Sequence, residues 1–183
     1  MKRKNYLWSF IKSILLALIL VFIINTWLFK AVQVVGSSMY PTLKDGQQGF
    51  SSVISLNMEG LDRFDIVVVS TDPDFLVKRI IGLPNDKLEF RNDYLYINDE
   101  IINQDFLNDA YVREVKASYP YFTDNYGPIQ LGEDEYFLMG DNRHVSIDSR
   151  FSQYGSFNKE DIISKYMMVL YPFDEIEWVG EAK

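Results

Sequence analysis

The chain contains no cysteine and only one histidine, His144, among its 183 residues. Without cysteine there can be no disulfide, no thiolate metal site and no cysteine nucleophile. A metal site has no other support, because the sequence shows neither a histidine cluster nor a calcium-loop pattern. A serine hydrolase with a histidine base would have to use His144, and lone histidines are usually surface or structural residues. We therefore expect neither a metal nor another cofactor.

Positive charge is also scarce, since 18 lysines and arginines stand against 26 acidic residues and give a net charge of -8. Proteins bind the phosphates of nucleic acids through clustered lysine and arginine. No basic cluster of that kind is visible, so nucleic acid is not an expected partner. The length suits one domain with an appendage, and the sequence does not indicate an oligomeric state.

The N-terminal region contains one long apolar run, in which only Ser13, Asn25 and Thr26 interrupt the apolar residues between positions 13 and 29. This length is at the short limit for crossing about 30 Å of hydrocarbon. Lysine and arginine before the run place the N-terminus in the cytoplasm by the positive-inside rule. A removable signal peptide has the same charged start, but no small-x-small cleavage pattern follows. We predict a cytoplasmic segment 1–12, a single transmembrane helix 13–29 in the cell membrane, and an extracytoplasmic domain 30–183.

Beyond residue 30 the sequence predicts strands rather than helices. The apolar, β-branched runs 64–69 and 167–171 are typical of buried strands. Residues 88–102 alternate and are interrupted by Asn-Asp pairs at 92–93 and 98–99, which favour the tight turns of a β-meander. Further predictions are a strand at 136–139 and a short, capped helical turn at 158–161. No helix-like segment of ordinary length follows the N-terminal run, so the domain should be mostly antiparallel β.

Residues 103–132 resist assignment, because tyrosines and phenylalanines are scattered among charged residues and two prolines. An aromatic surface loop, an insertion in the sheet and a partner-contact region all remain open.

Two residues could carry out acyl transfer together. Ser38 lies in a turn nine residues after Phe29, within about 30 Å of extended chain from the apolar run. Lys78 lies in an apolar strand, and burial can lower the pKa of a lysine by up to 3–5 units from about 10.4. A neutral Lys78 amine could then accept the Ser38 proton. Taken singly, the serine is typical of an ordinary turn and the lysine of a solvated strand edge.

Four motifs, taken in order, resemble those of the type I signal peptidases, which are membrane-bound Ser/Lys endopeptidases. They are residues 38–43, 63–68, 78–84 and 140–143, the last followed by Ser146, Asp148, Ser149 and Arg150. The resemblance implies a mostly β fold, with an antiparallel β-sheet catalytic domain preceded by one N-terminal transmembrane helix. It also implies removal of signal peptides from exported preproteins, after small residues at positions -1 and -3.

The resemblance further implies individual roles. Ser38 would be the nucleophile and Lys78 the general base, with Ser146 orienting the amine. Gly36 stands where some relatives have a serine that helps to bind the oxyanion, so the Ser38 N–H would carry most of that role. Asp148 and Arg150 would form a supporting ion pair, and Arg79 and Asp141 would be structural partners of the site. The resemblance also implies shallow substrate pockets, lined by Met39, Leu43, Leu76 and Val77.

Other readings of the same chain remain open. A non-proteolytic or single-substrate assembly factor, or a chaperone for a surface polymer such as a pilus, could use the same fold. The presence of both Ser38 and Lys78 favours the enzyme. A soluble, self-cleaving repressor-type Ser/Lys protease conflicts with the apolar N-terminal run.

Overall fold

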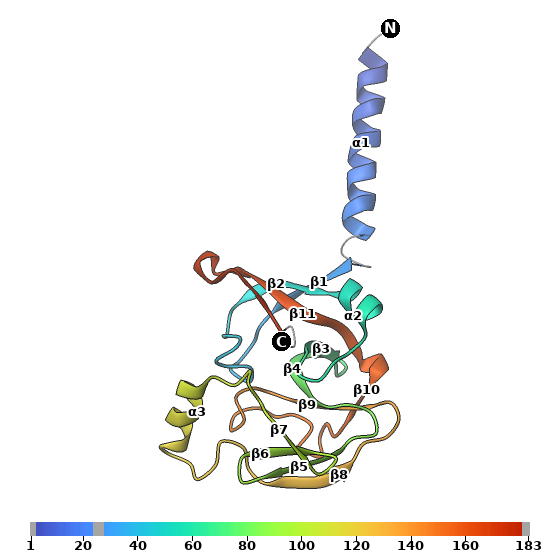
Figure 1. The fold of residues 1–183 in the computed structure, drawn as a ribbon. Helices are drawn as coiled ribbons and strands as arrows, with labels where there is room; N and C mark the ends of the chain where they lie inside the picture. Colours follow the sequence, from blue (N-terminus) through green and yellow to red (C-terminus); the bar gives the residue numbers. More distant parts are fainter. Residues whose placement is uncertain (1–2, 24–27, 181–183) are drawn as a thin grey trace.

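The computed structural model describes residues 3–23 and 28–180 and contains two antiparallel sheets (Figure 1). The larger sheet has the strand order β1-β2-β11-β3-β4-β9-β10, and β12 pairs with β11. Its strands are β1 (Phe29–Gln33), β2 (Gln48–Ser52), β3 (Ile66–Ser70), β4 (Phe75–Gly82), β9 (Glu135–Met139), β10 (Phe157–Asn158), β11 (Ile162–Tyr171) and β12 (Glu177–Val179).

The smaller sheet has the order β7-β6-β5-β8. It consists of β5 (Lys87–Arg91), β6 (Tyr94–Ile97), β7 (Glu100–Ile102) and β8 (Tyr126–Gln130). The predicted β-meander at 88–102 is confirmed. The Asn-Asp pairs at 92–93 and 98–99 adopt positive φ, as the tight turns between these strands require.

The core lies on both faces of the larger sheet, and alternation along β9 shows this directly. Phe137 and Met139 pack into a cluster shared with the smaller sheet. Tyr136 and Leu138 point the other way, into a second cluster with residues of β3 and β11. Both sets are buried because the two faces of β9 are each covered, which explains its continuous apolar sequence.

The predicted strands at 64–69, 136–139 and 167–171 are confirmed by β3, β9 and the end of β11. The predicted turn at 158–161 is the 3-10 helix η2 (Lys159–Asp161), with a capping box between Asn158 and Asp161. A second 3-10 helix, η3 (Phe173–Glu175), precedes β12.

The domain is mostly antiparallel β, as expected, and it also contains two short helices that were not predicted individually. They are α2 (Val53–Glu59) and α3 (Asp109–Lys116), begun by side-chain caps from Ser52 and Asn108. Each has about two turns, too short for helical periodicity to emerge from the sequence. Residues 103–132 therefore contain α3 and β8, and β8 joins the smaller sheet by pairing with β5.

The N-terminal helix α1 (Arg3–Ile23) extends away from both sheets (Figure 1). Its position corrects the predicted helix at 13–29, because α1 already begins at Arg3 and Phe29 belongs to strand β1. Residues 24–27 of the predicted span lie outside the described residues. In the described part of the chain, no helix is both long enough and apolar enough to cross a membrane.

Candidate active site

Lys78 lies in the interior of the larger sheet, on β4 and opposite Val67 of β3. Its side chain is only 2% exposed, and its Nζ donates a hydrogen bond of 3.1 Å to Ser146 Oγ. Burial lowers the pKa of Lys78 to about 8, because the ammonium loses its hydration. At pH 7 about one amine in ten is then neutral, far more than for a lysine in water.

Lys165 on β11 is a second buried lysine, and its surroundings are different. Its Nζ lies 3.2 Å from carboxylate oxygens of both Asp65 and Glu59. Burial alone would lower the pKa of Lys165, but these partners and Tyr166 raise it above its ordinary value. The contrast assigns different chemistry to the two amines: Lys165 stays charged, whereas Lys78 faces a neutral hydroxyl and can exchange a proton.

The turn that carries Ser38 is held by its neighbours in the core. Met39 and Leu43 are buried in one cluster, and the Leu43 amide donates to the Met39 carbonyl at 2.9 Å. Asn142 fastens the turn from the other side, its backbone amide and its side-chain amide each donating at 3.0 Å to the carbonyls of Ser38 and Ser37. Ser38 itself remains half-buried between these two anchors.

Gly140 lies beside both the Ser38 turn and Ser146. A Cβ placed on Gly140 would overlap both the Ser38 carbonyl oxygen and Ser146 Oγ. Both groups therefore lie close to one another in the space that a side chain at position 140 would fill. Ser146 in turn contacts Lys78. Among the hydrogen bonds of the described residues, none joins Ser38 Oγ directly to Lys78 Nζ. Such contacts are often long before substrate binds.

Asp148 and Arg150 form the expected ion pair, with Arg150 Nε and Nη2 donating at 2.8 and 2.9 Å to the two carboxylate oxygens. Burial alone would raise the pKa of Asp148, but Arg150 lowers it below the ordinary value. Asp148 also accepts a 3.0 Å bond from the Gly140 amide, and Arg150 donates to the Arg143 carbonyl at 2.8 Å. The ion pair thus joins the beginning and the end of the loop 140–150, which carries Ser146.

Arg79 points to the other side of β4 and is buried as well, at 3% exposure. It donates two hydrogen bonds to the Asp141 carboxylate, at 2.8 and 2.6 Å. The Thr42 hydroxyl donates to the same carboxylate at 2.5 Å. Asp141 therefore ties the serine turn to β4. Thr42 has no individual role among the sequence-based expectations, because a single hydroxyl carries no recognisable pattern of its own.

Gly36 adopts a φ of +81°, and its amide donates to Asp45 Oδ1 at 2.8 Å. The left-handed backbone explains why glycine is suited to this turn. Because its N–H is already bonded, Gly36 offers no second donor toward an oxyanion near Ser38.

Comparison with known proteins decides the family. A model of the family described as signal peptidase, peptidase S26, matches residues 7–171. The chain belongs to the S26 signal peptidase family. It is 39% identical over 176 residues to signal peptidase I S of Bacillus subtilis strain 168, covering 96% of this chain and 94% of that protein. It is also 39% identical over 177 residues to signal peptidase I P of Bacillus subtilis subsp. natto, covering 96% and 95%.

A solved structure supports the same family. The crystal structure of a signal peptidase I from Enterococcus faecalis V583 is 30% identical, with a TM-score of 0.51. The match covers 57% of this chain and 95% of that one. The S26 signal peptidases are serine endopeptidases, so the chain is assigned to that enzyme class.

The four residues expected to form substrate pockets in this peptidase do not all meet in one place. Met39 and Leu43 are fully buried, and Val77 packs against their cluster. Leu76 packs against the cluster on the opposite face of the sheet. The described structure also exposes Val145 and Ile147, which flank buried Ser146 and which the sequence analysis did not assign to substrate binding.

Proposed function

We propose that this S26 peptidase acts as a signal peptidase I, with Ser38 as nucleophile and Lys78 as general base. The observation that carries the proposal is the buried Lys78 amine, whose pKa is about 8 and whose one described partner is the neutral Ser146 hydroxyl. The Ser38 turn lies against the same loop. The relatives named signal peptidase I cover nearly the whole chain.

In the proposed mechanism, neutral Lys78 accepts the Ser38 proton as the hydroxyl oxygen attacks the scissile carbonyl. The Lys78–Ser146 hydrogen bond restricts the amine so that its lone pair can face Ser38. The tetrahedral intermediate collapses to an ester on Ser38, and the Lys78 ammonium gives its proton to the departing amine. The same lysine then activates a water molecule, which hydrolyses the ester and frees Ser38.

The oxyanion of the intermediate would be bound mainly by the Ser38 N–H. Gly36 has no hydroxyl to contribute, and its own N–H is bonded to Asp45. We assign Asp148, Arg150, Arg79 and Asp141 to holding the two loops in place, because each joins separate segments around Ser38 or Ser146.

The substrates are exported preproteins, cut after small residues at positions -1 and -3. We propose that an extended peptide binds beside β4, with half-buried Leu76 and Val77 nearest its side chains. Met39 and Leu43 form the floor below the serine turn and limit the pocket depth from beneath. A shallow pocket of this kind accepts alanine and excludes larger residues by overlap.

The decisive experiment is incubation of the detergent-solubilised protein with a preprotein that carries an Ala-x-Ala site. We expect one cut after the second alanine, identified by N-terminal sequencing of the product. A matched preprotein with leucine at position -1 should remain uncut. A protein that binds several preproteins without cutting any would instead be the assembly factor considered above.

The rate should depend on pH through Lys78. Since the neutral amine is the active form and its pKa is lowered to about 8, kcat/KM should rise about tenfold per pH unit below pH 7 and level off above pH 9. A lysine in water would still be titrating near pH 10.4. Initial rates on a peptide substrate between pH 6 and 11 measure the midpoint, and a flat profile would exclude Lys78 as the base.

We also propose that α1 anchors the protein in the cell membrane as a single-pass helix with a cytoplasmic N-terminus. From Ile14 to Phe22 every side chain is apolar, so this part of α1 is apolar around its whole circumference, and Leu15, Leu18 and Phe22 are among the side chains that are more than half exposed. Such a surface is stable against lipid rather than water. Release of the protein from the membrane fraction after deletion of residues 1–23 would support this, and unchanged sedimentation with membranes would oppose the anchoring role.

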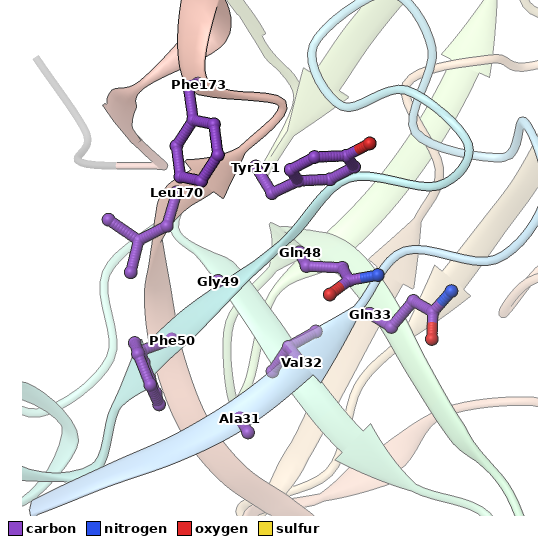
Figure 2. Close-up of a pocket in the computed structure, with 9 residues that line it drawn as sticks. All are labelled: Ala31, Val32, Gln33, Gln48, Gly49, Phe50, Leu170, Tyr171 and Phe173. Atoms are coloured by element: carbon purple, nitrogen blue, oxygen red, sulfur yellow. The ribbon is translucent and has the colours of Figure 1, made fainter.

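A second apolar surface lies at the end of the domain nearest α1. There β1, β2 and β11 surround a cavity of about 460 Å³, and Figure 2 shows Phe50, Leu170 and Phe173 along it. This cavity is formed by other strands than those that carry the Lys78–Ser146 site. We therefore propose that its apolar lining contacts lipid headgroups and acyl chains and takes no part in catalysis. This position would hold the domain close to the membrane surface.

A further inference from the structure

Residues 104–123 contact both loops of the candidate site, although sequence patterns left this region unassigned. A column of aromatic rings begins at Tyr40, two residues after Ser38. The Tyr40 ring meets Tyr111 of α3 edge-to-face at 5.1 Å, and Tyr111 meets Phe122 in the same way at 6.0 Å. The guanidinium of Arg143 lies 5.9 Å from the Phe122 ring. The column therefore runs from the serine turn to the loop that carries Ser146.

Arg143 provides the polar part of the same connection. Its guanidinium is buried, and it donates to Thr123 Oγ1 at 2.9 Å and to Gln104 Oε1 at 2.7 Å. Burial lowers the pKa of Arg143 to about 10, so the group stays charged at neutral pH. A buried cation that bonds only neutral oxygens of this segment fixes the position of the loop relative to the segment.

The segment is itself fixed to the smaller sheet. Asp93, in the turn between β5 and β6, accepts hydrogen bonds from the amides of Phe122 and Thr123 at 2.6 and 2.9 Å. It also pairs with Lys116 at the end of α3, at 2.5 Å. The Phe122 end of the column, and α3 with its central Tyr111, are therefore both held by the turn between β5 and β6 of the smaller sheet.

We propose that residues 104–123 act as a brace that sets the Ser38 turn against the Ser146 loop, with Tyr111 as its central positioning residue. This rests on the function proposed above. Tyr111 touches neither Ser38 nor Lys78 and acts through Tyr40. Because a displacement of about 1 Å at a reacting atom can cost about 10²-fold in rate, a brace at this junction matters for kcat more than for substrate binding.

The test compares Tyr111→Ala with Tyr111→Phe in the full-length protein. The phenylalanine keeps the ring, and no hydrogen bond from the Tyr111 hydroxyl is among the described contacts. We expect Tyr111→Ala to lower kcat about tenfold with KM changed less than about twofold, while Tyr111→Phe restores the wild-type rate. Arg113→Ala, exposed on the same helix, controls for general effects on α3.

Hydrogen exchange reports on the brace independently of activity. The amides of Leu43 and Asn142, which bond within the serine turn and across to it, should exchange roughly 2–10-fold faster in Tyr111→Ala and unchanged in Tyr111→Phe. Unchanged exchange in Tyr111→Ala overturns the brace, whatever the kinetics. If the wild-type protein cut no preprotein but Tyr111→Ala still exchanged faster than the wild type, the brace would be supported and the peptidase function rejected.

Discussion

Replacement of Lys78 by methionine is expected to lower kcat by about 10²–10⁴-fold, the usual contribution of a positioned general base. Methionine fills nearly the same volume but can accept no proton from Ser38. The residual rate of the variant should be independent of pH between 6 and 10, apart from the hydroxide reaction, because the titrating group is gone; the loss relative to the wild type should therefore grow as the pH rises toward 9. Single-turnover measurements on a peptide substrate determine the size of the loss and its pH dependence.

The same substitution should leave the fold intact or stabilise it. Because the pKa of Lys78 is lowered from 10.5 to about 8, burial of its charged form costs stability below pH 8, and the cost disappears between about pH 8 and 10.5. Methionine removes this cost at pH 7. We therefore expect Tm at pH 7 to equal or exceed that of the wild type, so that lost activity cannot be attributed to unfolding.

Lys165→Met is the matched control at the second buried lysine. It leaves the buried carboxylate of Asp65 without its cation, and loss of one partner of a buried pair costs about 3–5 kcal/mol. Tm should fall clearly, while the midpoint of the pH–rate profile stays near 8 in the folded fraction. If Lys165→Met moved that midpoint and Lys78→Met did not, the assignment of the base would be wrong.

The strands were predictable because their signal is local. Alternation and β-branched runs mark β3, β5, β6 and β9, and the Asn-Asp turns mark where the meander reverses. The short helices were not predictable, since α2 and α3 each depend on one side-chain cap and on packing against residues far away in the chain. The start of α1 was also misjudged, because its first turns mix charged and polar residues with apolar ones before the continuous apolar run begins.

At the candidate site, sequence indicated the residue types and structure supplied their environment. The apolar neighbours of Lys78 predicted its burial, and the spacing of Asp148 and Arg150 agrees with the ion pair that forms. Nothing local distinguishes Lys165, whose partners are about 100 residues away. The contacts of Asn142 with the serine turn are equally long-range, at a separation of 105 residues for its side chain. Such information exists only after the strands have paired.

Gly140→Ala is expected to reduce kcat/KM by about 10²-fold or more, although the change adds a single methyl group. The new Cβ would overlap the Ser38 carbonyl oxygen and Ser146 Oγ, so the serine turn and the Ser146 loop must separate. Lys78 would then lose its hydrogen-bonding partner or its approach to Ser38. Gly132→Ala provides the control, because a Cβ there meets only the flexible Glu135 side chain at 3.4 Å. Kinetics and thermal unfolding of both variants measure the effect, and a Gly140→Ala enzyme with wild-type kcat/KM would show that the two loops need not touch for catalysis.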